Sequence, residues 1–169
     1  MILAMDAHYK ESQAQTVGLT FDNWAADEPI EFFRQRTPIT ADYRPGEFYK
    51  RELPGLISLI QQIDVGNVKT IIIDGFVVLD DLGKAGLGLH LFEHLGGNIP
   101  VIGLAKTDFR SLKTSKAVVL RGQSKTPLFV TAAGIELNQA AQYIRQMHGP
   151  YRIPSLLKLL DQETKKWFD

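Results

Sequence analysis

The chain has 169 residues, of which 44% are hydrophobic and 22% are charged, and this is the composition of an ordinary globular domain with its own core. The 19 Lys and Arg residues balance the 19 Asp and Glu residues, so no excess of positive charge indicates a nucleic-acid partner. The absence of cysteine excludes disulfides, thiolate metal sites and a cysteine nucleophile, so any metal must be bound by oxygen or histidine.

Hydropathy gives no sign of a membrane segment. No apolar run approaches the ~18 residues of a membrane span, and Met1 leads directly into a strand-like pattern rather than an export signal. We therefore expect a cytoplasmic monomer without a membrane partner, folded as a single domain over residues 1–169.

Three short runs in the first forty residues predict an antiparallel meander. "MILAMDAHYK" is an apolar run interrupted by Asp6, "TVGLTFDNW" alternates apolar with small or polar residues, and "PIEFFRQRTPI" continues the strand-like pattern. The period then changes to the three and four of a helix packed on a sheet, with apolar residues at Tyr49, Leu53, Leu56, Ile60 and Ile63. Pro54 lies inside this stripe, so the helix either kinks there or begins there.

The second half of the chain has the pattern of an α/β domain. "VKTIIID" and "IPVIGLA" are apolar on both faces, as in buried strands, and "GKAGLGLHLFEHLGG" between them suits a helix ended by paired glycines. Strand, helix and strand at this spacing predict a parallel crossover. "KAVVLRG" and "TPLFVTAAG" then predict two more strands, "IELNQAAQYIRQM" a helix and "SLLKLLDQETKKWF" a final amphipathic helix. We expect a mixed α/β fold with antiparallel strands first and parallel strands after.

Four carboxylates lie at positions that favour partial burial. Asp6 and Asp74 each interrupt an apolar strand near its carboxyl end, where sites form in such sheets, and an unpaired buried carboxylate is costly. Asp161 lies beside the apolar face of its helix, and Glu52 does so if its helix extends back past Pro54. Each acid alone could be a turn residue, a cap or the partner of a nearby base.

Four acids that lean inward would repel one another strongly without a divalent cation. Ligation by oxygen alone suits Mg²⁺ or Mn²⁺. Pairs of such ions activate a water molecule and stabilise the leaving oxygen in phosphodiester hydrolysis. Of the four histidines, only His90 and His94 have a ligand-like clustering with acids, and we assign them packing or helix-surface roles.

Basic residues gather in the segment 106–125, which has a single acid, Asp108. A solvated loop and a patch that contacts phosphates both explain this pattern. The basic residues of the segment are Lys106, Arg110, Lys113, Lys116, Arg121 and Lys125.

Several stretches together resemble the endonuclease V family, metal-dependent nucleases with a ribonuclease H-like fold. "YRPGEFYKRE" at 43–52 is similar to the family's Tyr-x-Pro-Gly segment followed after five residues by Glu, and "IIIDG" to its strand that ends in Asp-Gly. "PVIGLAK" at 100–106 matches a family strand almost residue for residue, and "YRIPSLLKLLD" resembles the start of its final helix. The resemblance covers nearly the whole chain and implies a ribonuclease H-like mixed sheet flanked by helices.

The resemblance also implies roles for individual residues. Asp6, Glu52 and Asp74 match metal-binding carboxylates that serve catalysis, and Lys106 matches the active-site lysine near the scissile phosphate. Where the family has His on its last helix, this chain has Asp161, which resembles the fourth carboxylate of ribonuclease H and would complete a four-acid site for two ions.

A second set of positions concerns the nucleic acid. Tyr43 matches the aromatic residue of the strand-wedging loop, where a ring can stack on a displaced base. We expect Arg44, Lys106 and Arg110 to contact the nucleic acid as well. Asp80 occupies the position of a family His and is expected to support the metal ligands from behind.

The resemblance implies cleavage of DNA or RNA that leaves a 3′-hydroxyl and a 5′-phosphate, in the family at deaminated (inosine) bases during nucleic-acid repair. The family's Ser-Pro-Gly-His, which helps to form the pocket for the deaminated base, is replaced here by residues 131–134. Two alternatives therefore stay open: a ribonuclease H-like nuclease that chooses its substrate by structure, and a non-catalytic descendant that binds nucleic acid or a protein.

Overall fold

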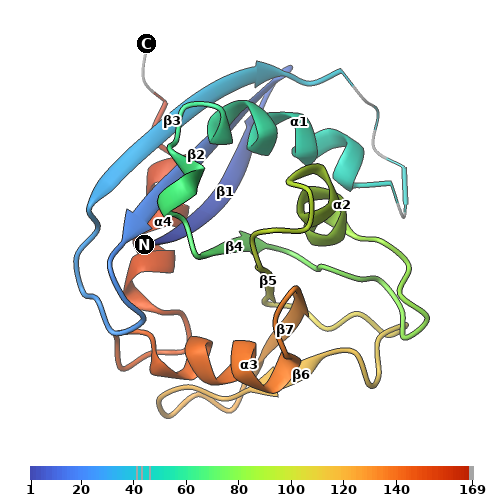
Figure 1. The fold of residues 1–169 in the computed structure, drawn as a ribbon, viewed down its shortest axis with the longest axis vertical. Helices are drawn as coiled ribbons and strands as arrows, with labels where there is room; N and C mark the ends of the chain where they lie inside the picture. The colour runs from blue at the N-terminus through green and yellow to red at the C-terminus, as the bar shows by residue number, and fades with distance from the viewer. Residues whose placement is uncertain (41, 43, 46, 168–169) are drawn as a thin grey trace.

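The computed structural model describes residues 1–40, 42, 44, 45 and 47–167. In this part of the chain, a seven-stranded mixed sheet has helices on both of its faces (Figure 1). The strands are β1 (Ile2–Lys10), β2 (Gln13–Phe21), β3 (Glu31–Pro38), β4 (Thr70–Asp74), β5 (Val101–Ala105), β6 (Ala117–Val119) and β7 (Leu128–Ala133). The helices are α1 (Tyr49–Ile60), α2 (Leu87–His94), α3 (Leu137–Gln146) and α4 (Ser155–Thr164), with a short 3₁₀ turn, η1 (Val65–Asn67).

The strand order is β3-β2-β1-β4-β5-β7-β6. The predicted meander is confirmed, because β1 pairs antiparallel with β2 and β2 with β3. The parallel crossover is confirmed as well, since β4 lies parallel to both β1 and β5. Beyond β5 the sheet continues with two antiparallel pairs, β5 with β7 and β7 with β6, so the parallel part occupies only the centre. Because the link from β6 to β7 is too short for a crossover helix, these two strands pair antiparallel.

Helix α1 begins before Pro54 and continues through it. The next residue, Gly55, is buried and faces β2, where an added Cβ would come within 2.5 Å of the Thr16 hydroxyl oxygen. Glycine therefore allows the helix to approach the sheet closely, and this packing offsets the hydrogen bond that proline cannot donate. Because the helix extends back past Pro54, Glu52 lies in its first turn, as the prediction for this acid requires.

Two apolar cores lie on opposite faces of the sheet. On β1, Leu3 and Met5 pack with residues of α1 and α2, whereas Ile2 and Ala4 pack with residues of α3 and α4. This alternation is the period of two expected of a strand. Burial of each large apolar side chain stabilises the fold by roughly 1.5–3 kcal/mol. The alternation also decides on which face of the sheet a polar residue lies. Asp6 comes two residues after Ala4 and therefore lies on the same face as Ala4.

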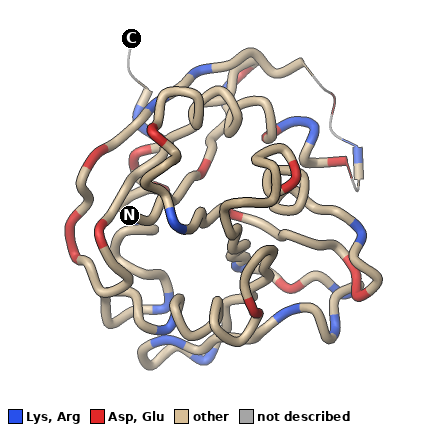
Figure 2. Tube along the Cα trace, viewed as in Figure 1, with Lys and Arg blue, Asp and Glu red and all other residues tan. Residues whose placement is uncertain are grey.

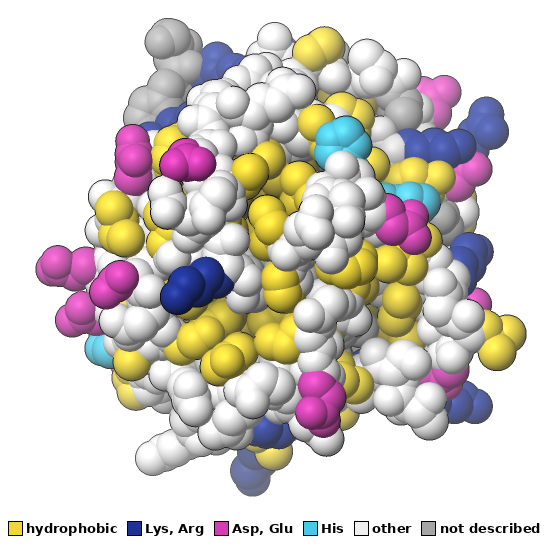
Figure 3. Space-filling model, viewed as in Figure 1, with side chains coloured by type: hydrophobic (Ala, Val, Ile, Leu, Met, Phe, Trp, Pro, Cys, Tyr) yellow, Lys and Arg dark blue, Asp and Glu magenta, His cyan; other side chains and the backbone are white. Residues whose placement is uncertain are grey.

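Charged residues of both signs occur in all parts of the chain, in equal numbers overall (Figure 2). On the face shown in Figure 3, hydrophobic side chains gather in the middle and most charged side chains lie toward the rim. Among the described helices, none combines the length and the apolar character needed to cross a membrane.

Candidate active site

Asp6 and Asp74 are neighbours on adjacent parallel strands. The register pairs Met5 of β1 with Ile73 of β4, so the two acids come next at the point where this pairing ends. Asp6 comes two residues after Ala4, and Asp74 two residues after Ile72. Side chains two residues apart on a strand share a face, so both acids lie on the face that α4 covers. One expectation needs correction, because β1 runs on to Lys10. Asp6 lies at the end of the β4 pairing, not at the end of its own strand, since β2 continues to pair with β1 up to that residue.

Lys106 and Asp161 complete a small cavity with these two acids. Lys106 is the first residue after β5, the other parallel neighbour of β4, and Asp161 comes from α4. The four side chains line a cavity of about 40 Å³, which is room for about one water molecule. Its remaining walls are mostly apolar and include Leu104, Leu128, Ile153, Leu157 and Leu160. Four residues predicted from distant parts of the chain thus share one cavity.

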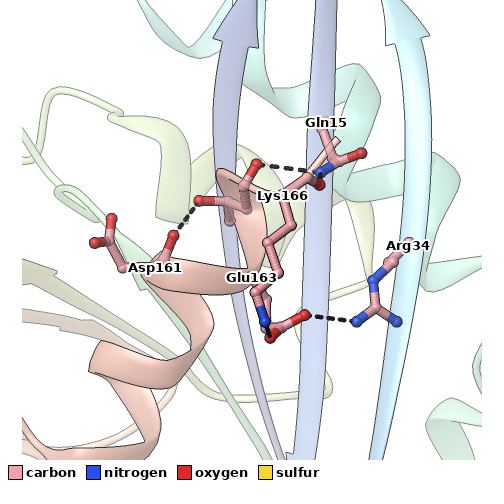
Figure 4. Close-up of polar contacts among 6 residues, drawn as sticks. Gln15, Arg34, Asp161, Glu163 and Lys166 are labelled. Carbon is pink, nitrogen blue, oxygen red and sulfur yellow. Dashed lines mark hydrogen bonds and ion pairs between the residues drawn. The ribbon is translucent and has the colours of Figure 1, made fainter. Parts of the chain in front are cut away.

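The position of Asp161 depends on how α4 is attached to the sheet. At the end of the helix, Glu163 is buried and accepts a hydrogen bond of 2.8 Å from Nη2 of Arg34 on β3, and Gln15 of β2 donates to the carbonyl of Thr164 at 3.2 Å. The Thr164 hydroxyl donates to the Asp161 carbonyl at 2.6 Å. Figure 4 shows Glu163 facing Arg34 and the Asp161 carboxylate on the other side of the helix. The polar attachment on one side therefore directs Asp161 toward the cavity on the other.

Glu52 approaches the same place from the opposite face of the sheet. Burial, together with the negative charges of Asp6 and Asp74, raises its pKa to about 8. The Tyr9 hydroxyl lies against Glu52 and lowers this pKa, although its buried oxygen has no partner at good hydrogen-bond geometry among the described residues. Arg51, which lies over the Tyr9 ring at 4.7 Å, also lowers it. Glu52 is thus within the electrostatic reach of the other acids without lining their cavity.

The two acids on β1 and β4 have raised pKa values. Burial and then the charge of Asp74 raise the pKa of Asp6 to about 7, against the hydrogen bond of 2.7 Å that its carboxylate accepts from the Ala7 N–H. Asp74 is more exposed than Asp6, but partial desolvation still raises its pKa. The positive charge of Lys106 opposes this rise. Asp161 forms an ion pair of 2.8 Å with Lys165, so one of the four acids has its own cation.

This group of oxygen ligands fits a hard divalent cation. Crowded carboxylates whose pKa values are raised by burial and by one another are stabilised when a cation replaces their protons, and oxygen is the ligand type that Mg²⁺ and Mn²⁺ prefer. No three acids or histidines in the described ranges already have the geometry of a metal site. The fit therefore rests on donor chemistry and shared location, and ligation would require the carboxylates to draw together.

A second cavity, of about 320 Å³, adjoins the first because Asp74 lines both. Its walls are aromatic, and the rings of Phe76 and Phe109 lie 5.6 Å apart. Tyr49 also lines it and stacks on His90 at 3.7 Å, which agrees with the packing role expected of that histidine. The other lining residues are Phe48, Gly75, Leu79, Gly86 and Leu87. Sequence reasoning missed this cavity, although Phe76 directly follows the Asp-Gly pair.

Two further acids have structural partners. The Asp80 carboxylate accepts backbone hydrogen bonds within its own loop, from Leu82 at 3.0 Å and Lys84 at 2.9 Å, and it does not line the acid cavity. Asp81 accepts three backbone N–H groups of residues 113–115 at 2.9 to 3.0 Å, and these bonds lower its pKa to about 2. Asp81 therefore ties the basic segment to the loop after β4.

The predicted contacts to nucleic acid have mixed outcomes. Tyr43 lies outside the described residues, whereas Arg44 and Arg110 are exposed on the surface. The cluster in 106–125 is only partly a surface patch, because Lys116 pairs with Asp108 and Arg121 is buried at 5% exposure. Arg121 donates to backbone carbonyls of residues 147–152, so it cannot contact a phosphate.

Thr131 is the residue at which the resemblance places the start of the base-pocket segment. It is fully buried, and its hydroxyl accepts a hydrogen bond of 2.8 Å from the backbone N–H of Val77. The hydroxyl holds the loop after Asp74 against β7. It does not line the aromatic cavity, so it offers no polar group to a base there.

Comparison with known proteins agrees with this fold. The family model described as Endonuclease V matches residues 1–162. Endonuclease V from Streptomyces avermitilis has a TM-score of 0.78 at 19% identity over 97% of this chain and 79% of that one. The Bacillus subtilis structure gives 0.76 at 22% identity over 96% and 78%.

Endonuclease V from Ciona intestinalis, in complex with a 24mer DNA that contains an inosine followed by a ribo-adenosine, has a TM-score of 0.79 at 16% identity. That similarity covers 97% of this chain and 84% of the other. No curated protein matches. At these identities the solved structures establish the ribonuclease H-like fold, and the match of the family model over nearly the whole length establishes that this chain belongs to the endonuclease V family.

Proposed function

We propose that this member of the endonuclease V family is a divalent-metal-dependent endonuclease that hydrolyses phosphodiester bonds in DNA or RNA. The observation that carries the proposal is the shared cavity of Asp6, Asp74, Asp161 and Lys106, with Glu52 acting on it from the other face of the sheet. Mg²⁺ or Mn²⁺ is the cofactor that these ligands favour.

Each of these residues has its own role in the proposed hydrolysis. Asp6 and Asp74 would hold the cation where the pairing of β1 with β4 ends, and Glu52 and Asp161 would complete its shell from the two helices. A bound divalent cation supplies a Lewis acid that activates water and stabilises negative charge on the leaving oxygen. Lys106 brings a cation to the same cavity, where its ammonium group would neutralise a phosphate oxygen as charge builds up in the transition state.

The aromatic cavity supports substrate recognition through a displaced base. It adjoins Asp74, its volume of about 320 Å³ suits a nucleobase, and its rings offer stacking surfaces. The inosine-containing DNA bound by the Ciona intestinalis enzyme makes a deaminated base the first candidate substrate, with a role in nucleic-acid repair.

The burial of Thr131 favours a second candidate. Because its hydroxyl is engaged by Val77 and the cavity is lined mainly by apolar side chains, this chain has few side-chain groups with which to read hypoxanthine. A ribonuclease H-like nuclease that chooses its substrate by structure, such as a junction or a single-stranded end, would need no such group.

A cleavage assay tests these proposals together. Labelled single-stranded DNA and RNA, with inosine or with matched adenosine at one position, are incubated with Mg²⁺ or Mn²⁺, and structured substrates without inosine are run beside them. We expect cleavage by the parent and by Asp27→Asn, an exposed acid that does not line the cavity, and a loss of at least about 100-fold in Asp74→Asn. Cleavage only of structured substrates would favour the second candidate. No cleavage of any substrate would leave a non-catalytic binding protein and refute the proposal.

A further inference from the structure

Two arginines behind the acid cavity bind backbone carbonyls instead of acids. Arg121 is 5% exposed, and its guanidinium donates to the carbonyls of Tyr151 at 2.9 Å and Gly149 at 3.1 Å, and to two more at Met147 and Arg152. In the described ranges, neither Arg121 nor Arg152 has a carboxylate within ion-pair distance. A buried guanidinium without an anion is costly, so the carbonyl dipoles must offset its desolvation. Arg121 thereby fixes the segment 147–152.

Arg152 extends this network to the active-site lysine. Its Nη2 atom donates to the carbonyl of Lys106 at 2.6 Å and to the carbonyl of Pro127 at 2.8 Å. The neighbouring Nε atom is buried without a hydrogen-bond partner in the described residues, so these two carbonyls hold the guanidinium. The next residue, Ile153, lines the acid cavity that Lys106 also lines. One guanidinium thus joins the end of β5 to the segment before α4.

We propose that Arg152 is a positioning residue for Lys106, and that Arg121 holds the segment from which Arg152 acts. Lys106 has an exposed side chain on a flexible stem, so the reach of its ammonium group depends on where its backbone is held. The Lys106 carbonyl is the first beyond β5, and Arg152 fixes it at this point. The catalytic consequence rests on the proposed function, because a displacement of about 1 Å in a catalytic group can cost up to about 100-fold in rate.

A double-mutant cycle separates positioning from a general structural role. Arg152→Met removes the donors but keeps the aliphatic stem, and Lys106→Ala removes the ammonium group. In the parent background we expect Arg152→Met to lower kcat by about 10- to 100-fold with little change in KM. In the Lys106→Ala background the same change should cost less than about twofold, because the group it positions is gone. An equal loss in both backgrounds would overturn the proposal.

Arg145→Met is the matched control, since Arg145 also donates to a backbone carbonyl, that of Val118 at 3.5 Å, but on the exposed surface of α3. It should leave kcat unchanged. If Arg152→Met does not fold, Arg152→Lys replaces it in the cycle. Lysine keeps the charge but is shorter, so the same non-additivity is expected with a smaller loss.

Hydrogen exchange provides a readout that does not depend on nuclease activity. Amide exchange in residues 105–110 should become at least about tenfold faster in Arg152→Met and stay unchanged in Arg145→Met. Unchanged exchange in Arg152→Met would overturn the positioning role even in an active enzyme. If the parent cleaves no substrate but Arg152→Met still exchanges faster than the parent, the structural link is supported and the proposed function fails.

Discussion

The raised pKa of Asp6 predicts a pH-dependent instability of the metal-free protein. An unfolded chain loses this proton near pH 3.8, whereas the folded protein keeps it to about pH 7. The folded state therefore binds this proton more tightly than the unfolded state does. Stability is lost as the pH rises from the unfolded pKa toward the folded one, and not as the pH falls. About three pKa units correspond to roughly 4 kcal/mol, of which about 2.5 kcal/mol falls between pH 5 and pH 8.

Thermal unfolding with a chelator present measures this loss. Asp6→Asn removes the titrating group, so its melting temperature relative to the parent should rise by about 5–10 °C between pH 5 and pH 8. Asp27→Asn, an exposed acid, should follow the parent at both pH values. Adding Mg²⁺ at pH 8 should raise the parent's melting temperature and not that of Asp6→Asn. Parallel pH profiles for the parent and Asp6→Asn would refute the reasoning that this carboxylate is crowded and desolvated.

Three further predictions concern the elements around the cavity. Glu163→Gln should lower the free energy of unfolding by roughly 1.5–3 kcal/mol in urea titrations, because Arg34 loses a charged partner, and an unchanged value would contradict this attachment of α4. Asp81→Ala should speed trypsin cleavage after the lysines of 113–116, since their backbone loses its acceptor; an unchanged digestion rate would show that other contacts hold the segment. Phe109→Ala should weaken binding of a substrate oligonucleotide by about 5- to 100-fold in fluorescence titrations, whereas Leu82→Ala, 97% exposed, should not, and equal affinities would argue against base stacking in the aromatic cavity.

Much of the fold follows from local patterns. The apolar run 71–73 and its counterpart at 101–105 are buried on both faces, as expected of strands in the centre of a sheet that helices cover on both sides. Where local signals conflict, tertiary packing decides. Pro54 is the example, because α1 continues through it while Gly55 packs against Thr16. The last helix also ends at Thr164, earlier than its apolar pattern predicts.

The site was predictable where a charge interrupts an apolar pattern. Asp6 and Asp74 stand out in this way, the helical apolar stripes indicated Glu52 and Asp161, and the family resemblance added Lys106. The long-range contacts of Arg152, Glu163 and Asp81 were not predictable, because each joins segments at least 25 residues apart and uses backbone groups or long side chains that leave no periodic signal. Asp80 and Asp81 are alike in sequence, but one binds its own loop and the other a distant segment.

Anomalous diffraction from a crystal grown with Mn²⁺ tests the central claim most directly. We predict a strong anomalous peak within about 2–2.5 Å of carboxylate oxygens of both Asp6 and Asp74, with Glu52 or Asp161 turned toward it. The peak should be absent from crystals of Asp74→Asn grown under the same conditions. Density only at exposed acids elsewhere, with none at Asp6 and Asp74, would contradict the account.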